Sequence, residues 1–282
     1  MARLHLRALH ASDLEVAAPV AAAAFGLDIR EPAAAERWLA RVAYALETDP
    51  DGAYLAELGG EIVGVAQAIE RERLWCLSLL AVTPSAQSSG AGRALMERAL
   101  TYATETTDIG IITSSSDPRA LRLYALSGFA LWPTFEVAGT LDRSALPQPR
   151  GEVHSASRDD LESLAPISRE IRGAPHTLEL EYALRMGMRV LRIGDRGFAV
   201  VSPGHGVWLL VARDDGAAEQ LLWAALTIVA TEHPTVRWIT AEQQWAIEIV
   251  VRAGLRLVPF GALCVRGAPG PMRAFLPSGP FA

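Results

Sequence analysis

The pattern of apolar and polar positions divides the first half of the chain into short strand-like runs and longer segments with helical spacing. Alternating or continuous apolar runs of five to thirteen residues are typical of strands, and apolar residues recurring every three or four positions are typical of helices. We expect strands at residues 4–9, 53–58, 61–69, 74–82, 109–113 and 129–141, and helices at 13–24, 32–46, from the glycine-rich loop to about 103, and 118–127. An antiparallel start followed by strand–helix–strand–helix–strand predicts an α/β layered domain of about 140 residues.

The pattern then begins again. The residues shared between Asp13–Pro19 and Asp160–Pro166 lie at a constant offset of 147 positions, and Gly128 recurs as Gly254 at an offset of 126. Identities that cluster at equivalent points of one plan indicate an internal repeat.

A proline-containing segment at residues 142–151 is typical of a linker. We therefore predict two tandem domains, at residues 1–142 and 152–282, each a mixed and mostly antiparallel sheet flanked by helices. The fold class is α/β in the layered, α+β sense.

Charge is unevenly distributed along the 282 residues, whose formal net charge is −6. Residues 1–146 hold 12 arginines and 18 acidic residues, whereas residues 147–282 hold 14 of each, and the chain has no lysine. An acidic first half without a basic run argues against nucleic acid or an anionic membrane as the main partner. The same charge favours a cationic or amine-bearing substrate, although a solvated acidic surface explains it equally well.

Cys76 and Cys264 lie in apolar runs, which predicts two buried free thiols rather than a disulfide or a metal site. The six histidines show no ligand spacing, so we expect no metal. Neither a signal-peptide core nor an apolar run long enough to cross a bilayer is present, and the expected location is the cytoplasm.

The strongest local feature is a glycine-rich loop between a strand and a helix. The strand end Leu80–Val82 is followed by Gln87–Arg93, which contains Gly90 and Gly92. Glycines before a helix let the main chain approach a ligand, and the free N–H groups of the first turn favour a phosphate there. A dinucleotide fingerprint would need a third glycine where Leu95 stands, and a P-loop would need a lysine. On this segment alone, a simple tight turn also remains open.

A second motif about thirty residues later makes the pattern specific. Residues 117–129 contain Ala120, Tyr124 and the pair Gly128-Phe129 in the spacing Ala-x-x-x-Tyr-x-x-x-Gly-Phe. The two motifs, in this order and at this separation, resemble the GNAT superfamily of N-acetyltransferases over residues 3–141. One departure is Asp117, where the family often has asparagine.

The resemblance implies a role for each matched segment. The amides of the glycine-rich loop would hold the pyrophosphate of coenzyme A, and the strand end would splay from the strand at 109–113 to bind pantetheine. The N–H of Val82 would polarise the thioester carbonyl, and Tyr124 would protonate the departing thiolate. The implied cofactor-binding residues are Leu80, Ala81, Val82, Gln87, Ser88, Ser89, Gly90, Ala91, Gly92, Arg93, Asp117, Ala120 and Tyr124.

Two points about the chemistry stay open in the sequence. Periodicity alone allows Tyr124 to be a core aromatic rather than an acid. The strand at 75–82 contains no carboxylate or histidine, so no general base is visible. Glu70 and Glu72 lie nearby, and a water relay is the alternative. A primary amine with a pKa of about 10 must lose a proton before it attacks the thioester.

The second half has lost this apparatus. Residues 208–212 match the cofactor strand, but the loop after them is shorter and carries Asp214 and Asp215 where an anion would bind. Val250 stands at the position of Tyr124, 126 residues on. We therefore expect a degenerate domain without a competent coenzyme A site.

Together these patterns predict an enzyme that moves an acetyl group from acetyl-CoA to a primary amine by direct attack. The alternative is a non-catalytic module that senses acyl-CoA or another ligand. The acceptor stays open among antibiotic, polyamine, amino-acid and protein N-terminal amines, because recognition would lie in variable segments such as residues 27–46. The oligomeric state also stays open, although two fused units could form an internal pseudo-dimer and leave the chain monomeric.

Overall fold

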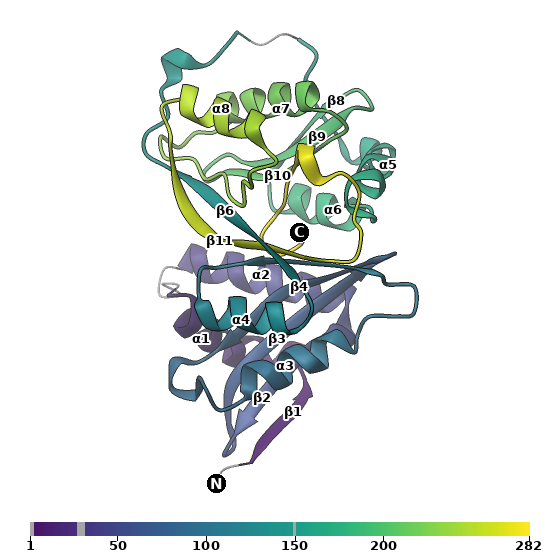
Figure 1. Cartoon of the computed structure of the whole chain (residues 1–282), viewed down its shortest axis with the longest axis vertical. Coiled ribbons are helices and arrows are strands. Elements are labelled where there is room, and N and C mark those ends of the chain that lie inside the picture. The colour runs from purple at the N-terminus through teal and green to yellow at the C-terminus, as the bar shows by residue number, and fades with distance from the viewer. Residues whose placement is uncertain (1–2, 27–31, 149–150) are drawn as a thin grey trace. The chain divides into compact units, whose positions relative to one another are not determined.

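The computed structural model describes residues 3–26, 32–148 and 151–282. The chain folds into two compact units (Figure 1). Unit 1 comprises Met1–Glu70 and Trp75–Thr107, and unit 2 comprises Arg71–Leu74 and Asp108–Ala282. These compact units differ from the two sequence halves, because segments of both halves contribute to unit 2. The division into 1–142 and 152–282 stays a prediction about the repeat.

Unit 1 is an α/β layer built on four strands in the order β1-β2-β3-β4. Strands β1 and β2 pair antiparallel, as do β2 and β3, and the β2–β3 turn is Gly59-Gly60 with φ of +66° and +90°. Two positive φ angles match the twist of a two-residue hairpin, which is why glycines occupy both positions. The elements are β1 (Leu4–Ala8), α1 (Leu14–Phe25), α2 (Pro32–Thr48), β2 (Ala53–Leu58), β3 (Glu61–Arg71), β4 (Leu74–Val82) and α3 (Ala91–Leu100).

The helices of unit 1 cover opposite faces of this sheet. Buried residues of α1 and α2, including Val20 and Val42, pack in one cluster with Leu55, Val65 and Leu79 of the strands. On the other face, a Cβ added at Gly64 would meet Leu95 of α3 at 2.7 Å, so a glycine allows α3 to pack closely. The sheet is therefore covered on both sides, as its near-continuous apolar strands predict.

In unit 2, a strand from the second half of the chain lies between two strands from the first half. The order is β5 (Ile109–Ser114), β11 (Arg256–Arg266), β6 (Ala130–Ala138). Cys264 of β11 pairs with Ile112 on one side and with Leu131 on the other, both antiparallel. The N–H and C=O groups of β5 and β6 that face β11 are thus satisfied by residues at least 118 positions away (256 − 138 = 118).

The second sheet of unit 2 repeats the plan of unit 1, in the order β12-β10-β9-β8-β7. Helices α7 and α8 form a core with one face of it, through residues such as Ala199, Leu210 and Leu222. His176, next to α6, contacts the ring of Phe198 on the other face. The elements are α4 (Pro118–Leu126), β7 (His154–Ser155), α5 (Leu161–Arg172), α6 (Thr177–Arg185), β8 (Arg189–Ile193), β9 (Gly197–Ser202), β10 (Gly206–Ala212), α7 (Asp215–Ile228), α8 (Gln244–Arg252) and β12 (Phe275–Leu276).

Equivalent elements start and end at the offsets found in the sequence. Helices α1 and α5 begin 147 residues apart, both contain a proline, and both end at a left-handed glycine, Gly26 or Gly173. Helices α4 and α8 begin 126 residues apart, and Gly128 and Gly254 follow them with φ of +86° and +77°. The repeat in sequence is therefore a repeat of structure.

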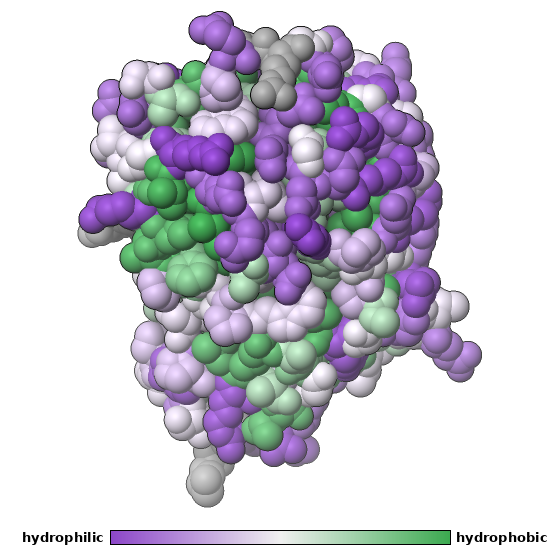
Figure 2. Space-filling model, turned by 45° about the horizontal axis from the view of Figure 1, so that its top comes forward, coloured by the Kyte–Doolittle hydropathy of each residue, from purple (hydrophilic) through white to green (hydrophobic). Residues whose placement is uncertain are grey.

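Most expected elements of the first half are confirmed within one to three residues, and β4 and β2 match the prediction at both ends. Pro149 and Arg150 of the expected linker, and residues 27–31 of the expected recognition segment, lie outside the described residues. On the face drawn in Figure 2, hydrophilic and hydrophobic residues are interspersed. Among the described residues, no helix is both long and apolar enough to cross a membrane.

Candidate functional site

The expected cofactor residues fall in both units, and the larger group lies in unit 1 where β4 leads into α3. A short 3₁₀ turn at Pro84–Ala86 follows β4, and α3 begins at Ala91 with Gly90 as its N-cap. Ser88 and Gly90 have φ of +70° and +91°. A positive φ raises the conformational energy of a residue that has a Cβ, whereas glycine adopts it readily. The main chain at Ser88 is therefore held in an unusual conformation.

The N-terminus of α3 has no side-chain cap of its own, and the loop that precedes it is exposed. Ser88, Ser89 and Gly90 are exposed, and Gly90 provides no capping oxygen. The N–H of Ala91 reaches the Oγ of Ser89 at 3.3 Å, which is a long hydrogen bond. Because the first N–H groups of a helix lack intrahelical partners, they are available to an anion.

The two loop glycines leave the space that a phosphate would need. A Cβ added at Gly90 would have no atom within 4 Å, and one added at Gly92 would meet only the Val82 side chain at 3.6 Å. No side chain therefore covers the main chain at these two glycines, except that of Val82 at the end of β4. This arrangement fits a pyrophosphate group. The Arg93 side chain pairs with Glu97 along the exposed face of α3, with Nε and Oε1 2.7 Å apart.

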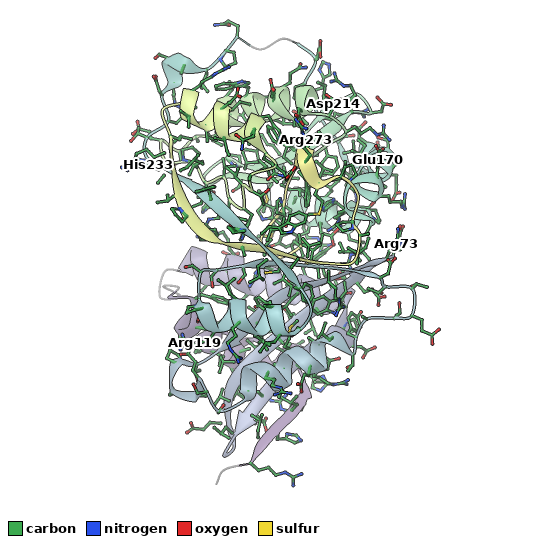
Figure 3. The ribbon with its side chains drawn as sticks, in the orientation of Figure 1. Arg73, Arg119, Glu170, Asp214, His233 and Arg273 are labelled. Carbon is green, nitrogen blue, oxygen red and sulfur yellow. The ribbon has the colours of Figure 1, made fainter. Side chains whose placement is uncertain are left out.

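The other expected residues lie on α4 in unit 2. Asp117 is the N-cap of this helix and accepts a hydrogen bond from the N–H of Arg119 at 2.9 Å. The guanidinium of Arg119, labelled in Figure 3, also binds the same carboxylate and holds its pKa below the usual value. Asp117 thus has a structural function at the start of the helix. Ala120, one turn into α4, is partly buried.

Tyr124 is buried at the end of α4, 5% exposed, and burial raises the pKa of its hydroxyl. Cys264 of β11 and Asp117 also raise the pKa of Tyr124, because negative charge on either group disfavours a tyrosinate. Burial also raises the pKa of Cys264 to about 12, so this thiol is protonated at neutral pH. A tyrosine of this kind keeps its proton at neutral pH, and its raised pKa makes it a weaker acid than a free tyrosine.

The Gly-Phe pair after Tyr124 anchors the end of α4 to β5. Phe129 is buried, and its N–H donates to the carbonyl of Tyr124 at 3.1 Å. A Cβ added at Gly110 of β5 would meet the Phe129 ring at 2.8 Å. The motif therefore fixes the position of Tyr124 through packing that a larger residue at position 110 would prevent.

Both glutamates that were considered as the base have structural partners. Glu70 accepts hydrogen bonds from the N–H of Thr104 at 3.2 Å and from the hydroxyls of Thr104 and Thr107. Glu72 forms an ion pair with Arg169 at 2.8 Å. Neither carboxylate is therefore placed in the structure as a free proton acceptor, and a water relay is the better supported alternative.

The equivalent helix in the second half, α7, has a closed N-terminus. Asp214 is its N-cap and accepts from the N–H of Ala217 at 2.8 Å. Arg196 pairs with Asp214, and Arg273 pairs with Asp215, each at 2.6 Å. Asp214 and Arg273 are labelled in Figure 3. A carboxylate of the chain itself thus occupies the place where an anion would bind.

The sheet of the second half is closed in the same region by the end of the chain. The start of β10 bonds to the segment at Thr235, with the N–H of Val207 donating to the carbonyl of Thr235 at 2.9 Å. Further along β10, β12 takes this place, and Leu276 pairs with Leu210. The remaining cavity, of about 160 Å³, has mainly apolar and aromatic walls that include Trp208 and Trp238. It offers no charged anchor for a phosphate, because Arg237 in its wall pairs with Glu136.

A buried polar cluster holds the residues that follow β12. Arg172, fully buried, donates to the main-chain oxygens of Phe281 and Ala282 and lies 3.5 Å from Glu179. Glu179 is also paired with Arg71 at 2.9 Å. The sequence did not predict this cluster, because its members lie far apart in the chain. It did not predict β12 either, because the short Phe-Leu run before Pro277 is the only local signal of that strand.

No group of three or more histidine, cysteine, aspartate or glutamate side chains in the described part of the chain is arranged to hold a metal ion. Both cysteines are buried thiols outside any disulfide.

The comparisons with known proteins agree with this geometry. Residues 21–129 match the model of the acetyltransferase (GNAT) family, and this span contains the β4–α3 loop, Tyr124 and the Gly-Phe pair. Over this span, which is less than half of the chain, the sequence matches a GNAT acetyltransferase domain. No curated protein matches the chain.

Solved structures share the fold over almost the whole chain. A putative acetyltransferase from Pyrococcus horikoshii superposes with a TM-score of 0.83 at 19% identity, covering 99% of this chain and 96% of its own. A GCN5-related N-acetyltransferase from Sphaerobacter thermophilus gives 0.55 at 18% identity, over 95% and 97%. One from Kribbella flavida gives 0.60 at 19%, over 94% and 71%. At these identities the likeness establishes the fold.

Proposed function

We propose that the chain transfers an acetyl group from acetyl-CoA to a primary amine by direct attack. The observation that carries this proposal is the start of α3, where an exposed loop at residues 88–90 leads from β4 into a helix without a capping side chain. This feature lies inside the segment that matches the GNAT family. The group supplied by acetyl-CoA would be the activated acetyl thioester.

Each matched residue has a defined task in this proposal. The amides of Ser88 to Arg93, with Gln87, bind the pyrophosphate, and the main chain of Leu80–Val82 binds the amide groups of the pantetheine arm. A main-chain N–H at Val82 stabilises negative charge on the carbonyl oxygen during the transfer. Asp117 and Ala120, at the start of α4, are the further proposed contacts to the cofactor.

Tyr124 is the proposed general acid. Burial keeps its hydroxyl protonated, so a proton is available at neutral pH. The amine loses its own proton to water, because Glu70 and Glu72 are held in other contacts. No acyl-enzyme is needed, and Cys264 with its raised pKa is a poor nucleophile.

The second half acts in this proposal as a degenerate copy. Its α7 is capped by Asp214, and its cleft is filled by β12. The proposed partners are one acetyl-CoA per chain and a small-molecule or peptide amine.

The test is a thiol-release assay with a panel of amines, together with calorimetry of acetyl-CoA binding. We expect one site per chain and release of free thiol that depends on one class of amine. Two equivalent sites would contradict the assignment of the halves.

A second candidate is a non-catalytic acyl-CoA sensor, which the lack of a carboxylate or histidine on residues 75–82 favours. Binding at one site without thiol release for any amine would support the sensor and reject the enzyme.

A further inference from the structure

Strand β4 changes the face that it presents before it reaches the proposed cofactor loop. The indole N–H of Trp75 donates to the carbonyl of Ala99 in α3 at 3.0 Å, so Trp75 faces α3. Leu79 and Ala81 belong to the cluster under α1 and α2, on the opposite face. Positions 75, 79 and 81 of a regular strand would share one face. The alternation is therefore broken between Trp75 and Leu79, which is the effect of one extra residue in a β-bulge.

Ser78 lies at this break, and a side chain from α2 binds its main chain. The Nη1 of Arg41 donates to the carbonyl of Ser78 at 3.2 Å. A bulge disrupts the ladder of hydrogen bonds, so that a carbonyl becomes available to a donor outside the sheet. The Oγ of Ser78 is buried and has no hydrogen-bond partner among the described residues. The hydrogen bond from Arg41 thus ties the main chain of Ser78 to α2.

The position of Arg41 is itself fixed by its neighbours on α2. The Nε2 of Gln67, on β3, donates to the carbonyl of Val42 at 3.0 Å in the buried interior. Trp38 and Val42 pack in the same cluster as Leu79. Consecutive residues of α2 are therefore bound to two neighbouring strands, and the guanidinium is held over the bulge.

We propose that Arg41 is a positioning residue that sets the direction of β4 after the bulge. The residues that follow are Leu80–Val82, whose main chain receives the pantetheine arm and the acetyl carbonyl in the proposed function, on which this inference rests. A bond to a charged donor contributes more than a neutral one, and its loss from a buried carbonyl is costly. Without Arg41 the strand end has more than one direction, and its N–H groups no longer converge on one position.

The test compares Arg41→Met with Arg37→Met, which removes an exposed arginine one turn earlier on the same helix. In Arg41→Met we expect kcat to fall about tenfold or more, the loss expected for one hydrogen bond to a charged group. We also expect the preference for acetyl-CoA over free coenzyme A, measured by calorimetry, to approach one, because only the acetylated form uses the aligned N–H. Arg37→Met keeps the wild-type values.

A readout that needs no activity comes from hydrogen exchange of the free protein. In Arg41→Met, amides in the peptide covering residues 74–83 exchange faster than in the wild type, while the same peptide in Arg37→Met is unchanged. Arg41→Lys, which keeps a charged donor, restores part of the protection and part of kcat. If Arg41→Met is poorly folded, the same measurements on Arg41→Lys test the role of Arg41 in its place.

The outcomes separate this inference from the proposed function. Equal exchange and equal coenzyme preference in both methionine variants would overturn the role of Arg41, even if the wild type acetylates amines. A wild type that neither binds acetyl-CoA nor releases thiol would overturn the proposed function. The rate of amide hydrogen exchange in residues 74–83 would still decide whether Arg41 orders the strand.

Discussion

Helices α3 and α7 start at equivalent points of the two halves, yet their first turns are built in opposite ways. Helix α3 begins after Gly90, which has no side chain, and the loop before it is exposed. Helix α7 begins after Asp214, whose carboxylate takes the N–H of Ala217 and is itself paired with Arg196. A helix N-terminus attracts one anion, and in α7 that anion is already part of the chain. The comparison contrasts the proposed ligand site at α3 with a helix end that a capping residue of the chain itself closes.

The same contrast extends to the strands beside these helices. In the second half, β12 pairs with the end of β10 and fills the place next to it. The cavity beside this region has mainly apolar and aromatic walls, and the arginine in them, Arg237, is paired with Glu136. The predictions below test this difference between an open first half and a closed second half, starting with the largest expected effect.

Truncation after Leu141 should prevent the first half from folding. It removes β11, which lies between β5 and β6 and pairs with both. The exposed strand edges and apolar surface would favour aggregation. The measurement is solubility and cooperative unfolding of the fragment, with the full chain as reference. A soluble fragment with a sharp unfolding transition would mean that the exchanged strand is dispensable.

Gly90→Asp should abolish acetyl-CoA binding, with a loss of at least about 100-fold in affinity. The added carboxylate would cap α3 as Asp214 caps α7 and repel a phosphate, and a single strong charge contact is worth about this much. Gly60→Asp is the matched control, since Gly60 also has a positive φ, of +90°, and open space around it. Calorimetry checks both variants. Retained binding in Gly90→Asp would place the phosphates elsewhere. Gly92→Asp should act similarly, because its side chain would point toward Val82.

Tyr124→Phe should lower kcat by about 10²–10⁴-fold, the usual contribution of general acid catalysis. The ring keeps its buried packing, so acetyl-CoA affinity should stay within about threefold of the wild type. Because the pKa of Tyr124 is raised, the wild-type rate should show no tyrosine titration between about pH 6 and 9. An unchanged kcat would make Tyr124 a packing residue, and a collapse of affinity would make its role structural.

Unit 2 should lose stability as the pH falls below about 6.5. Burial lowers the pKa of His176 far below the 6.5 of a free histidine, with the nearby Arg172 as a second cause. Below 6.5 the unfolded chain binds a proton that the folded chain excludes, so the free energy of unfolding falls by about 1.4 kcal/mol per pH unit. Denaturant unfolding from pH 7 to 5 measures the slope.

His176→Gln should reduce this slope even if it lowers stability overall, because the titrating group is gone. His205→Gln is the control, since His205 is exposed on a turn between β9 and β10. A slope that persists in His176→Gln would assign the effect to other groups.

The smallest effects are expected at the closed end of the second half. Asp214→Ala should cost about 1 kcal/mol of stability through the lost helix cap. Asp215→Ala should cost less, because its pair with Arg273 is at the surface. Neither change should alter acetyl-CoA affinity. A clear fall in affinity with the fold intact would show that the second loop contributes to the cofactor site.

The sequence by itself determined the local elements and the loop chemistry. Apolar periodicity defined β4 and α4 almost to the residue, because helix and strand periods are properties of consecutive side chains. Gly90 and Gly128 marked positions of positive φ for the same local reason. The offsets of 147 and 126 identified the repeat before any contact was known.

Only the tertiary structure decided which distant segments complete each unit. In the sheets, Cys264 pairs with both Ile112 and Leu131, and Leu276 pairs with Leu210. Between α2 and β4, Arg41 donates a hydrogen bond to the carbonyl of Ser78. None of these pairs has a signature in its own neighbourhood, since β11 and β12 read as ordinary apolar runs. Their partners were selected by the need to satisfy main-chain groups and bury apolar faces across the whole unit, which no short segment of sequence encodes.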